Sequence, residues 1–240
     1  MANDGLLHEL SRVGRDVVRA GLVVGSGGNL SVRRPGAQAL WVTAAGTWLD
    51  RLEESSYVEV RLDDGGPVRR GRAKLADGSG DGVGEHDPDG PETTSRPGVD
   101  RGIAPTSELP LHLATYRARP DVNAIVHLHP QMTILLDALG ERIRLVTTDH
   151  AYYVGPIART GFYPPGSTAL AEAAAAAVAD GTNCVILTHQ GCSVLGETLD
   201  LAHRRAANLE EAARLTYQAL LLTGGLPGRE VPQSPSSGTV

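Results

Sequence analysis

Two histidines separated by one residue, His127 and His129, are the residues in this sequence best suited to metal chemistry. They end the run DVNAIVHLH, which is typical of a buried strand, and alternation along a strand points residues i and i+2 to the same side. Two imidazoles then converge on one point, and imidazole is the commonest nitrogen ligand of divalent transition metals. An isolated pair of this kind is more often an ordinary part of an edge strand, so the other residues must decide.

Glu108 is the second candidate, because it follows Thr106 and Ser107 at the start of an expected helix with one of these two as N-cap. A carboxylate there can simply interact favourably with the helix dipole. Two glycine-rich turns, at residues 25–29 and 43–46, expose backbone N–H groups that can bind a phosphate, although such turns also serve as plain tight turns.

The elements that would position these residues alternate along the chain. Apolar periodicity predicts a first helix at residues 4–20, a helix from residue 106 to Pro120, a short helix near 132–139, an alanine-rich helix at 168–180 and a long final helix that ends at Gly224. Strands are expected in the glycine-broken segment LVVGSGGNLSVR, around ALWVT, at 121–129 and at NCVILTH. The pattern indicates one α/β domain over residues 1–224, interrupted by a mobile insert at 63–103 and followed by a disordered tail at 225–240.

Composition excludes several classes of protein. The 240 residues carry 22 Lys and Arg against 28 Asp and Glu, a net charge of -6, which argues against a nucleic-acid or membrane partner. No apolar run approaches the ~20 residues of a membrane span, and the start lacks a secretory signal pattern, so we expect a soluble cytoplasmic protein. Only 9 residues are aromatic against 29 Gly, so the core must be aliphatic, and Cys184 and Cys192 are expected to be ordinary buried thiols.

The order of the motifs is more specific than any one of them. GLVVGSGGNLSVR, TAAGTWLDRL, PTSELPLHLATYRARPDVNAIVHLHP, FYPPGS and NCVILTHQGCSVLG follow one another as in the class II aldolase/adducin family, which the chain resembles from about Gly21 to Leu222. The resemblance implies a three-layer α/β/α sandwich with a central mixed or antiparallel sheet. It also implies a homotetramer with active sites at subunit interfaces and a divalent ion, most commonly Zn2+, in each subunit.

The resemblance further implies roles for individual residues. His127 and His129 would bind the metal, Glu108 would be the acid/base, and a phosphorylated sugar would be the substrate. The phosphate contacts implied are Ser26, Gly28, Asn29, Ala45, Gly46, Thr106 and Ser107.

The chain departs from the family at the third metal ligand. Members usually carry a histidine directly before the late glycine, whereas this sequence reads Thr188-His189-Gln190-Gly191. We expect His189 to reach the metal through a local bulge, because a neutral amide is a poor zinc ligand. The alternatives are a site with two histidines and water, or a weak or absent metal.

A second departure concerns the proton donor that a neighbouring subunit supplies as a tyrosine in fuculose-phosphate-type aldolases. The ungapped position is a threonine here, and His150, Tyr152 or Tyr153 could substitute, with His150 and Tyr152 our candidates. The same segment resembles family decarboxylases of phosphorylated 3-oxo acids, but those tend to carry a basic residue where this chain keeps Ser107. The resemblance therefore favours retro-aldol cleavage of a ketose phosphate to dihydroxyacetone phosphate and an aldehyde. Decarboxylation, epimerisation, dehydration and a non-catalytic adducin-like role remain the alternatives.

Overall fold

The computed structural model describes residues 4–68 and 103–223. Most of the predicted insert and the whole predicted tail lie outside these residues. Within them, one seven-stranded sheet has the order β3-β2-β1-β4-β7-β6-β5. The strands are β1 (Asn29–Val32), β2 (Ala39–Thr43), β3 (Tyr57–Arg61), β4 (Ala124–Leu128), β5 (Ile157–Arg159), β6 (Cys184–Leu187) and β7 (Gly191–Gly196).

The α-helices are α1 (Asp4–Arg19), α2 (Leu109–Ala118), α3 (Gln131–Ala138), α4 (Thr168–Ala177) and α5 (Leu199–Thr223). Short 3-10 turns, η1 (Leu49–Arg51) and η2 (Glu54–Ser56), and one π-helical turn, η3 (His150–Val154), complete the regular elements. None of the helices in the described ranges combines the length and apolar character that crossing a membrane requires.

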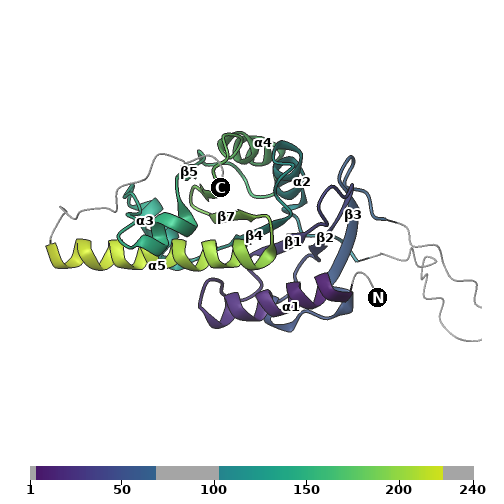
Figure 1. Ribbon diagram of the computed structural model, residues 1–240, viewed down its shortest axis with the longest axis horizontal. Helices are drawn as coiled ribbons and strands as arrows, with labels where there is room; N and C mark the ends of the chain where they lie inside the picture. The colour runs from purple at the N-terminus through teal and green to yellow at the C-terminus, as the bar shows by residue number, and fades with distance from the viewer. Residues whose placement is uncertain (1–3, 69–102, 224–240) are drawn as a thin grey trace, which may run out of the picture.

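Helices cover both faces of the sheet, with α2 and α4 above the strands and α1 and α5 below them in Figure 1. All neighbouring strands are antiparallel except β5 and β6, which are parallel, so the sheet is mixed. This arrangement confirms the predicted three-layer α/β/α sandwich.

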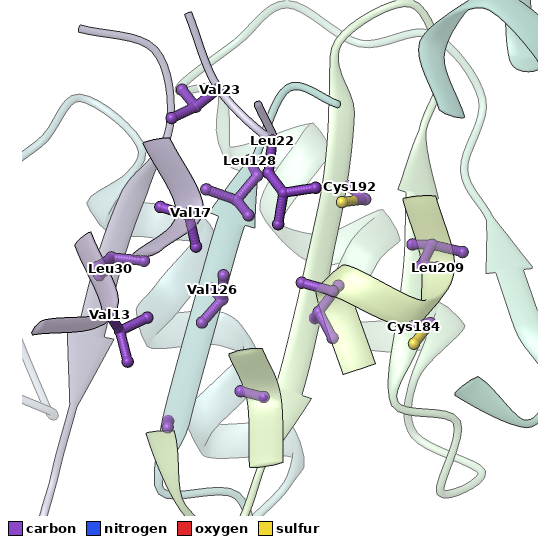
Figure 2. Packing of buried hydrophobic residues seen from close by; sticks show 14 of the residues in the cluster. Val13, Val17, Leu22, Val23, Leu30, Val126, Leu128, Cys184, Cys192 and Leu209 are labelled. Atoms are coloured by element: carbon purple, nitrogen blue, oxygen red, sulfur yellow. The ribbon is translucent and has the colours of Figure 1, made fainter. Parts of the chain in front are cut away.

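The core lies in two layers because alternate residues of each strand face opposite helices. On one face, Leu30 of β1 and Val126 of β4 pack with Val13 of α1 and Leu209 of α5, as Figure 2 shows. On the other face, Ile125 and Val185 pack against α2 and α4. The core is largely aliphatic, as the composition requires.

Both cysteines are fully buried free thiols in this core. Burial raises the pKa of the Cys184 thiol to about 12, and the pKa of Cys192 is raised for the same reason. They stay protonated and inert, which confirms their interpretation as packing residues.

Most predicted elements are confirmed, with corrections at their ends. The first helix ends at Arg19 and the final helix extends to Thr223, close to the expected limits. The predicted caps of α2 are wrong: Glu108 is its N-cap, because Thr106 and Ser107 belong to a turn before the helix. Strands β3, β5 and β7 and the π-helical turn were not predicted.

The first six residues of the predicted insert, 63–68, form a turn that pairs with β3. Val68 N–H donates to the carbonyl of Glu59 at 2.8 Å, and Pro67 forms a bridge with Val60. The remainder of the insert begins after this turn.

Candidate active site

A cavity of about 280 Å³ lies where β1 and β4 meet the turns that follow β2 and precede α2. It is lined by Ser26, Gly27, Gly28, Asn29, Ala44, Ala45, Gly46, Thr47, Thr106, Ser107, Glu108, His127, His129, Pro165 and Gln190. Residues from six separate stretches of the sequence therefore meet at one place.

The first glycine-rich turn must lie very close to β4. Gly28 has a φ of +75°, and a Cβ at this position would be 2.7 Å from the carbonyl oxygen of His127. Only glycine satisfies both conditions without strain. Asn29, the next residue, pairs directly with His127 in the antiparallel ladder, which places the turn beside the histidines.

Backbone hydrogen bonds fix the segment before α2 against the second turn. Thr106 N–H donates to the Thr43 carbonyl at 3.0 Å, and Ala45 N–H donates to the Ala104 carbonyl at 3.0 Å. Thr106 Oγ1 accepts the N–H of Glu108 at 3.2 Å, so the hydroxyl hydrogen of Thr106 remains available to a ligand. The glycine-rich turns and the segment before α2 thus both present small hydrogen-bond donors to the cavity.

The histidines converge as strand alternation predicts. Their Nε2 atoms are 3.2 Å apart, and the rings meet edge to face. Burial lowers the pKa of both, that of His127 well below its usual value, with the neighbouring His129 and His112 adding to the effect. Both imidazoles are therefore neutral near pH 7, the form that binds metal ions.

Glu108 is 5% exposed and faces Gln190 across the cavity. Gln190 Nε2 donates to Glu108 Oε1 at 2.9 Å, while Glu108 Oε2 and Gln190 Oε1 are buried without a hydrogen-bond partner in the described residues. Burial raises the pKa of Glu108, against the opposing effects of a Gly166 N–H group and Gln190. A carboxyl group in this setting is suited to accepting and returning a proton.

His189, predicted as the third metal ligand, does not line the cavity. It is exposed, has a φ of 60° and places its ring 6.1 Å from that of Phe162. Its backbone N–H donates to Asp137 Oδ2 at 2.8 Å, and Arg159 binds the other carboxylate oxygen of Asp137 at 2.7 Å. This turn directs Gln190, rather than His189, towards Glu108.

The two candidate proton donors also lie away from the cavity of this chain. His150 is fully buried, with Nε2 3.3 Å from Glu211 Oε2 on α5. Tyr152 is 80% exposed and contacts Tyr153.

The structure thus brings together ten of the thirteen predicted site residues and leaves His150, Tyr152 and His189 outside. Those it adds are Gly27, Ala44, Thr47, Pro165 and Gln190. All five lie within motifs already singled out, and that position was the available signal. In the described part of the chain, no three His, Cys, Asp or Glu side chains are grouped so as to hold a metal ion.

Comparison with known proteins shows which family the chain matches. Residues 8–217 match the family described as "Class II Aldolase and Adducin N-terminal domain". L-fuculose phosphate aldolase of Methanocaldococcus jannaschii is 32% identical over 200 residues, covering 83% of this chain and 89% of that protein. The 3-oxo-tetronate 4-phosphate decarboxylase of Escherichia coli (strain K12) is 28% identical over 217 residues, covering 88% and 86%.

A solved structure of L-fuculose 1-phosphate aldolase has the same fold. It superimposes with a TM-score of 0.75 at 24% identity and covers 97% of this chain and 92% of its own.

Proposed function

Because the chain belongs to the class II aldolase and adducin family, we propose that it is a divalent-metal-dependent lyase that cleaves a phosphorylated ketose to dihydroxyacetone phosphate and an aldehyde. The single observation that carries the proposal is the cavity in which Glu108, His127 and His129 lie beside three small-residue turns. An enzyme of this kind acts on cytoplasmic sugar phosphates. The relatives named above are aldolases and a decarboxylase of phosphorylated substrates, which supports this class of reaction.

The turns would bind the phosphate. Backbone N–H groups of Gly28 and Gly46 and the side chains of Ser26, Asn29 and Ser107 are short donors around one end of the cavity. Ala45 and Thr106 complete this set, Thr106 with the free hydroxyl hydrogen noted above. Several fixed donors bind a dianion without ordering long side chains, and they orient the substrate for reaction.

The residues present fit a divalent metal ion. Two imidazole nitrogens at about 2.0–2.1 Å from a tetrahedral zinc ion are separated by about 3.3 Å, and the two Nε2 atoms are 3.2 Å apart. His127 and His129 would hold the ion, one per subunit and Zn2+ by our proposal. When bound, the ion supplies a Lewis acid that polarises the substrate carbonyl and hydroxyl oxygens.

The third protein ligand is either His189, as the sequence predicts, or Gln190. A His189 ligand requires the turn at 188–190 to rearrange, whereas Gln190 Oε1 is already buried in the cavity without a partner. We therefore add Gln190 to the proposal, with substrate oxygens completing the coordination.

Glu108 would move the proton. Its unpartnered Oε2 is free to exchange a proton with the carbon next to the substrate carbonyl, while Gln190 holds Oε1 in place. The proton transfer at the leaving aldehyde would come from Tyr152 of a neighbouring subunit in a homotetramer, since this side chain is exposed outside the cavity of its own chain. His150, the other candidate, is fully buried and would reach a neighbour only if its π-helical turn opened.

Other functions remain alternatives to this proposal. The Escherichia coli relative makes decarboxylation the nearest alternative, followed by epimerisation or dehydration. A non-catalytic adducin-like role would follow if Gln190 in place of a histidine abolished metal binding.

The test is an assay of metal-loaded protein with a panel of ketose 1-phosphates, following dihydroxyacetone phosphate by a coupled enzyme, and with 3-oxo acid phosphates, following CO2. We expect dihydroxyacetone phosphate from at least one ketose and a loss of at least about 100-fold in kcat for Glu108→Gln. CO2 release without ketose cleavage would make the protein a decarboxylase.

Metal content of the same preparations tests the ligands. His127→Ala should lose the ion, Gln190→Ala should weaken its binding at least about tenfold, and His189→Ala should retain it. Loss of metal from His189→Ala but not from Gln190→Ala would restore the original ligand prediction.

A further inference from the structure

A chain of buried polar side chains lies directly beneath the cavity, between β1 and α2. His112 Nε2 is 2.5 Å from Asn29 Oδ1, and His112 Nδ1 is 2.7 Å from Ser31 Oγ. Ser31 Oγ is 2.9 Å from the Tyr116 hydroxyl oxygen, which also lies 3.4 Å from the Asn123 carbonyl oxygen. Of these side chains, only Asn29 lines the cavity.

The secondary structure explains how the four side chains meet. Asn29 and Ser31 are two residues apart on β1 and so face the same side of the sheet, towards α2. His112 and Tyr116 are four residues apart on α2 and so lie on one face of that helix. Ser31 and His112 are both 0% exposed, so no solvent competes for these hydrogen bonds.

The chemistry of the groups sets the direction of the chain. An amide oxygen only accepts hydrogen bonds, so His112 Nε2 must carry the hydrogen that Asn29 Oδ1 accepts. Full burial lowers the pKa of His112 to about 3, so Nδ1 has no hydrogen and accepts the Ser31 hydroxyl. Tyr116 then donates its single hydroxyl hydrogen to Ser31 Oγ, the nearer of its two acceptors, so each hydrogen bond between Tyr116 and Asn29 points towards Asn29.

The orientation of Asn29 follows. Its oxygen is occupied below the cavity, and its Nδ2 group has no hydrogen-bond partner within residues 4–68 and 103–223. An asparagine that is free to rotate presents either its oxygen or its NH2 group to a ligand, and the oxygen repels an anion. A fixed NH2 group offers two donors and no acceptor.

We propose that His112 is a positioning residue that locks the Asn29 amide with its NH2 group towards the cavity, and so makes this end of the site selective for a phosphoryl group. The proposal rests on the proposed function, which supplies the phosphorylated substrate. His112 touches no substrate and acts only through Asn29.

The experiment measures binding of inorganic phosphate by calorimetry, together with KM and kcat where turnover is found. His112→Phe keeps a ring but removes the donor, and we expect phosphate binding to weaken about tenfold, with the loss in KM rather than in kcat and with metal content unchanged. His112→Gln can still donate to Asn29 Oδ1 and should recover binding to within about threefold of the wild type.

Two comparisons separate positioning from a general structural role. Asn29→Ala should weaken phosphate binding, and adding His112→Phe to it should weaken binding no further, because the second residue acts through the first. Tyr116→Phe removes a hydroxyl from the far end of the same chain and should change phosphate affinity less than about twofold.

Thermal unfolding shows which variants are folded. Should His112→Phe fail to fold, Ser31→Ala replaces it: loss of the Nδ1 partner lets the ring change its hydrogen position, and phosphate binding should weaken about threefold. Equal phosphate affinity in the wild type and in folded His112→Phe overturns the proposal while leaving the proposed function intact. The proposal is also overturned if the loss of phosphate affinity in the Asn29→Ala, His112→Phe double variant equals the sum of the two single losses. A wild type that binds no phosphate overturns both.

Discussion

At Glu108 the structure places a carboxyl group where ionisation is costly. Its pKa is raised above the usual 4.5 chiefly by burial, so the folded protein favours the protonated form relative to the unfolded chain. The stabilisation from this group is full below pH 4.5 and is lost as the pH rises through the folded-state pKa. Above that pH, ionisation of Glu108 lowers the stability of the folded protein. Its proposed role as a base nevertheless requires this ionised form.

Glu108→Gln should therefore make the metal-free protein more stable at neutral pH. We expect a rise in Tm of about 2 to 4 °C at pH 7–8, the change that about 1 kcal/mol produces in a chain of this size. Scanning calorimetry with a chelator from pH 4 to 8 measures it, and the difference should shrink towards pH 4. Glu172→Gln, on the exposed side of α4, controls for the loss of one charge. A variant less stable than the wild type at pH 8 would contradict the argument.

The sequence predicted the site residues well where a local rule fixes side-chain direction. Alternation along β4 placed His127 and His129 together, and glycine marked the turns. The direction of residues 189 and 190 could not be predicted in this way, because it depends on Asp137, fifty-two residues before His189, accepting the His189 N–H. A positive φ at a histidine has no signature in the sequence.

Helix α3 depends on a residue from another helix for its start. Pro130 is its N-cap and gives no side-chain hydrogen bond, so the first N–H groups of α3 need another acceptor. Glu210 of α5 supplies it: Oε1 accepts from Met132 N–H at 3.0 Å, and Oε2 accepts from Thr133 N–H at 3.0 Å and from the Thr133 hydroxyl at 2.9 Å. Asp137, which anchors the turn carrying Gln190, is in the last turn of α3.

Glu210→Ala should therefore destabilise the protein by about 2 to 4 kcal/mol, because it leaves several buried donors unpaired. Glu210→Gln keeps one carbonyl oxygen as an acceptor, so its loss of stability should be about half that of Glu210→Ala. Urea unfolding measures both, with Glu172→Ala as the exposed control. Equal stability of Glu210→Ala and the wild type would show that water replaces the carboxylate.

Elements were predictable from sequence where one periodicity runs through them. The two long helices and β4 have such patterns. Strand β7, with glycine at both ends and Ser193 in the middle, has none, yet it is central because β4 and β6 pair with it on either side. The start of α2 was misplaced because Thr106 hydrogen-bonds within the preceding turn instead of capping the helix.

At the scale of the molecule, two of the large apolar side chains that are exposed in the described residues come from one segment, between α3 and α4. Tyr152 is 80% exposed and Phe162 is 66% exposed, and Tyr152 is one of the two candidate proton donors. Side chains of this kind are enriched at protein interfaces. They are consistent with the predicted homotetramer.

Subunit mixing tests the shared sites that the tetramer implies. Glu108→Gln and Tyr152→Phe homo-oligomers should each be nearly inactive, and mixing them after mild denaturation should restore up to about a quarter of the activity per site, because a mixed interface can combine an intact Glu108 with an intact Tyr152. Light scattering should give a mass of four chains. A monomer, or mixtures no more active than their components, would contradict interfacial sites.

The cavity beside the β3 edge has a different consequence. Val68 and Ile103, the residues on either side of the undescribed stretch, both line it together with Trp41 and Tyr57. The chain thus leaves the sheet and rejoins it at one place, and each doubling of the connection adds only about 0.6 kcal/mol of closure entropy. The length of the connection at this point therefore has little effect on stability. A fluorescent reporter or a purification handle could be inserted here without disturbing the candidate active site.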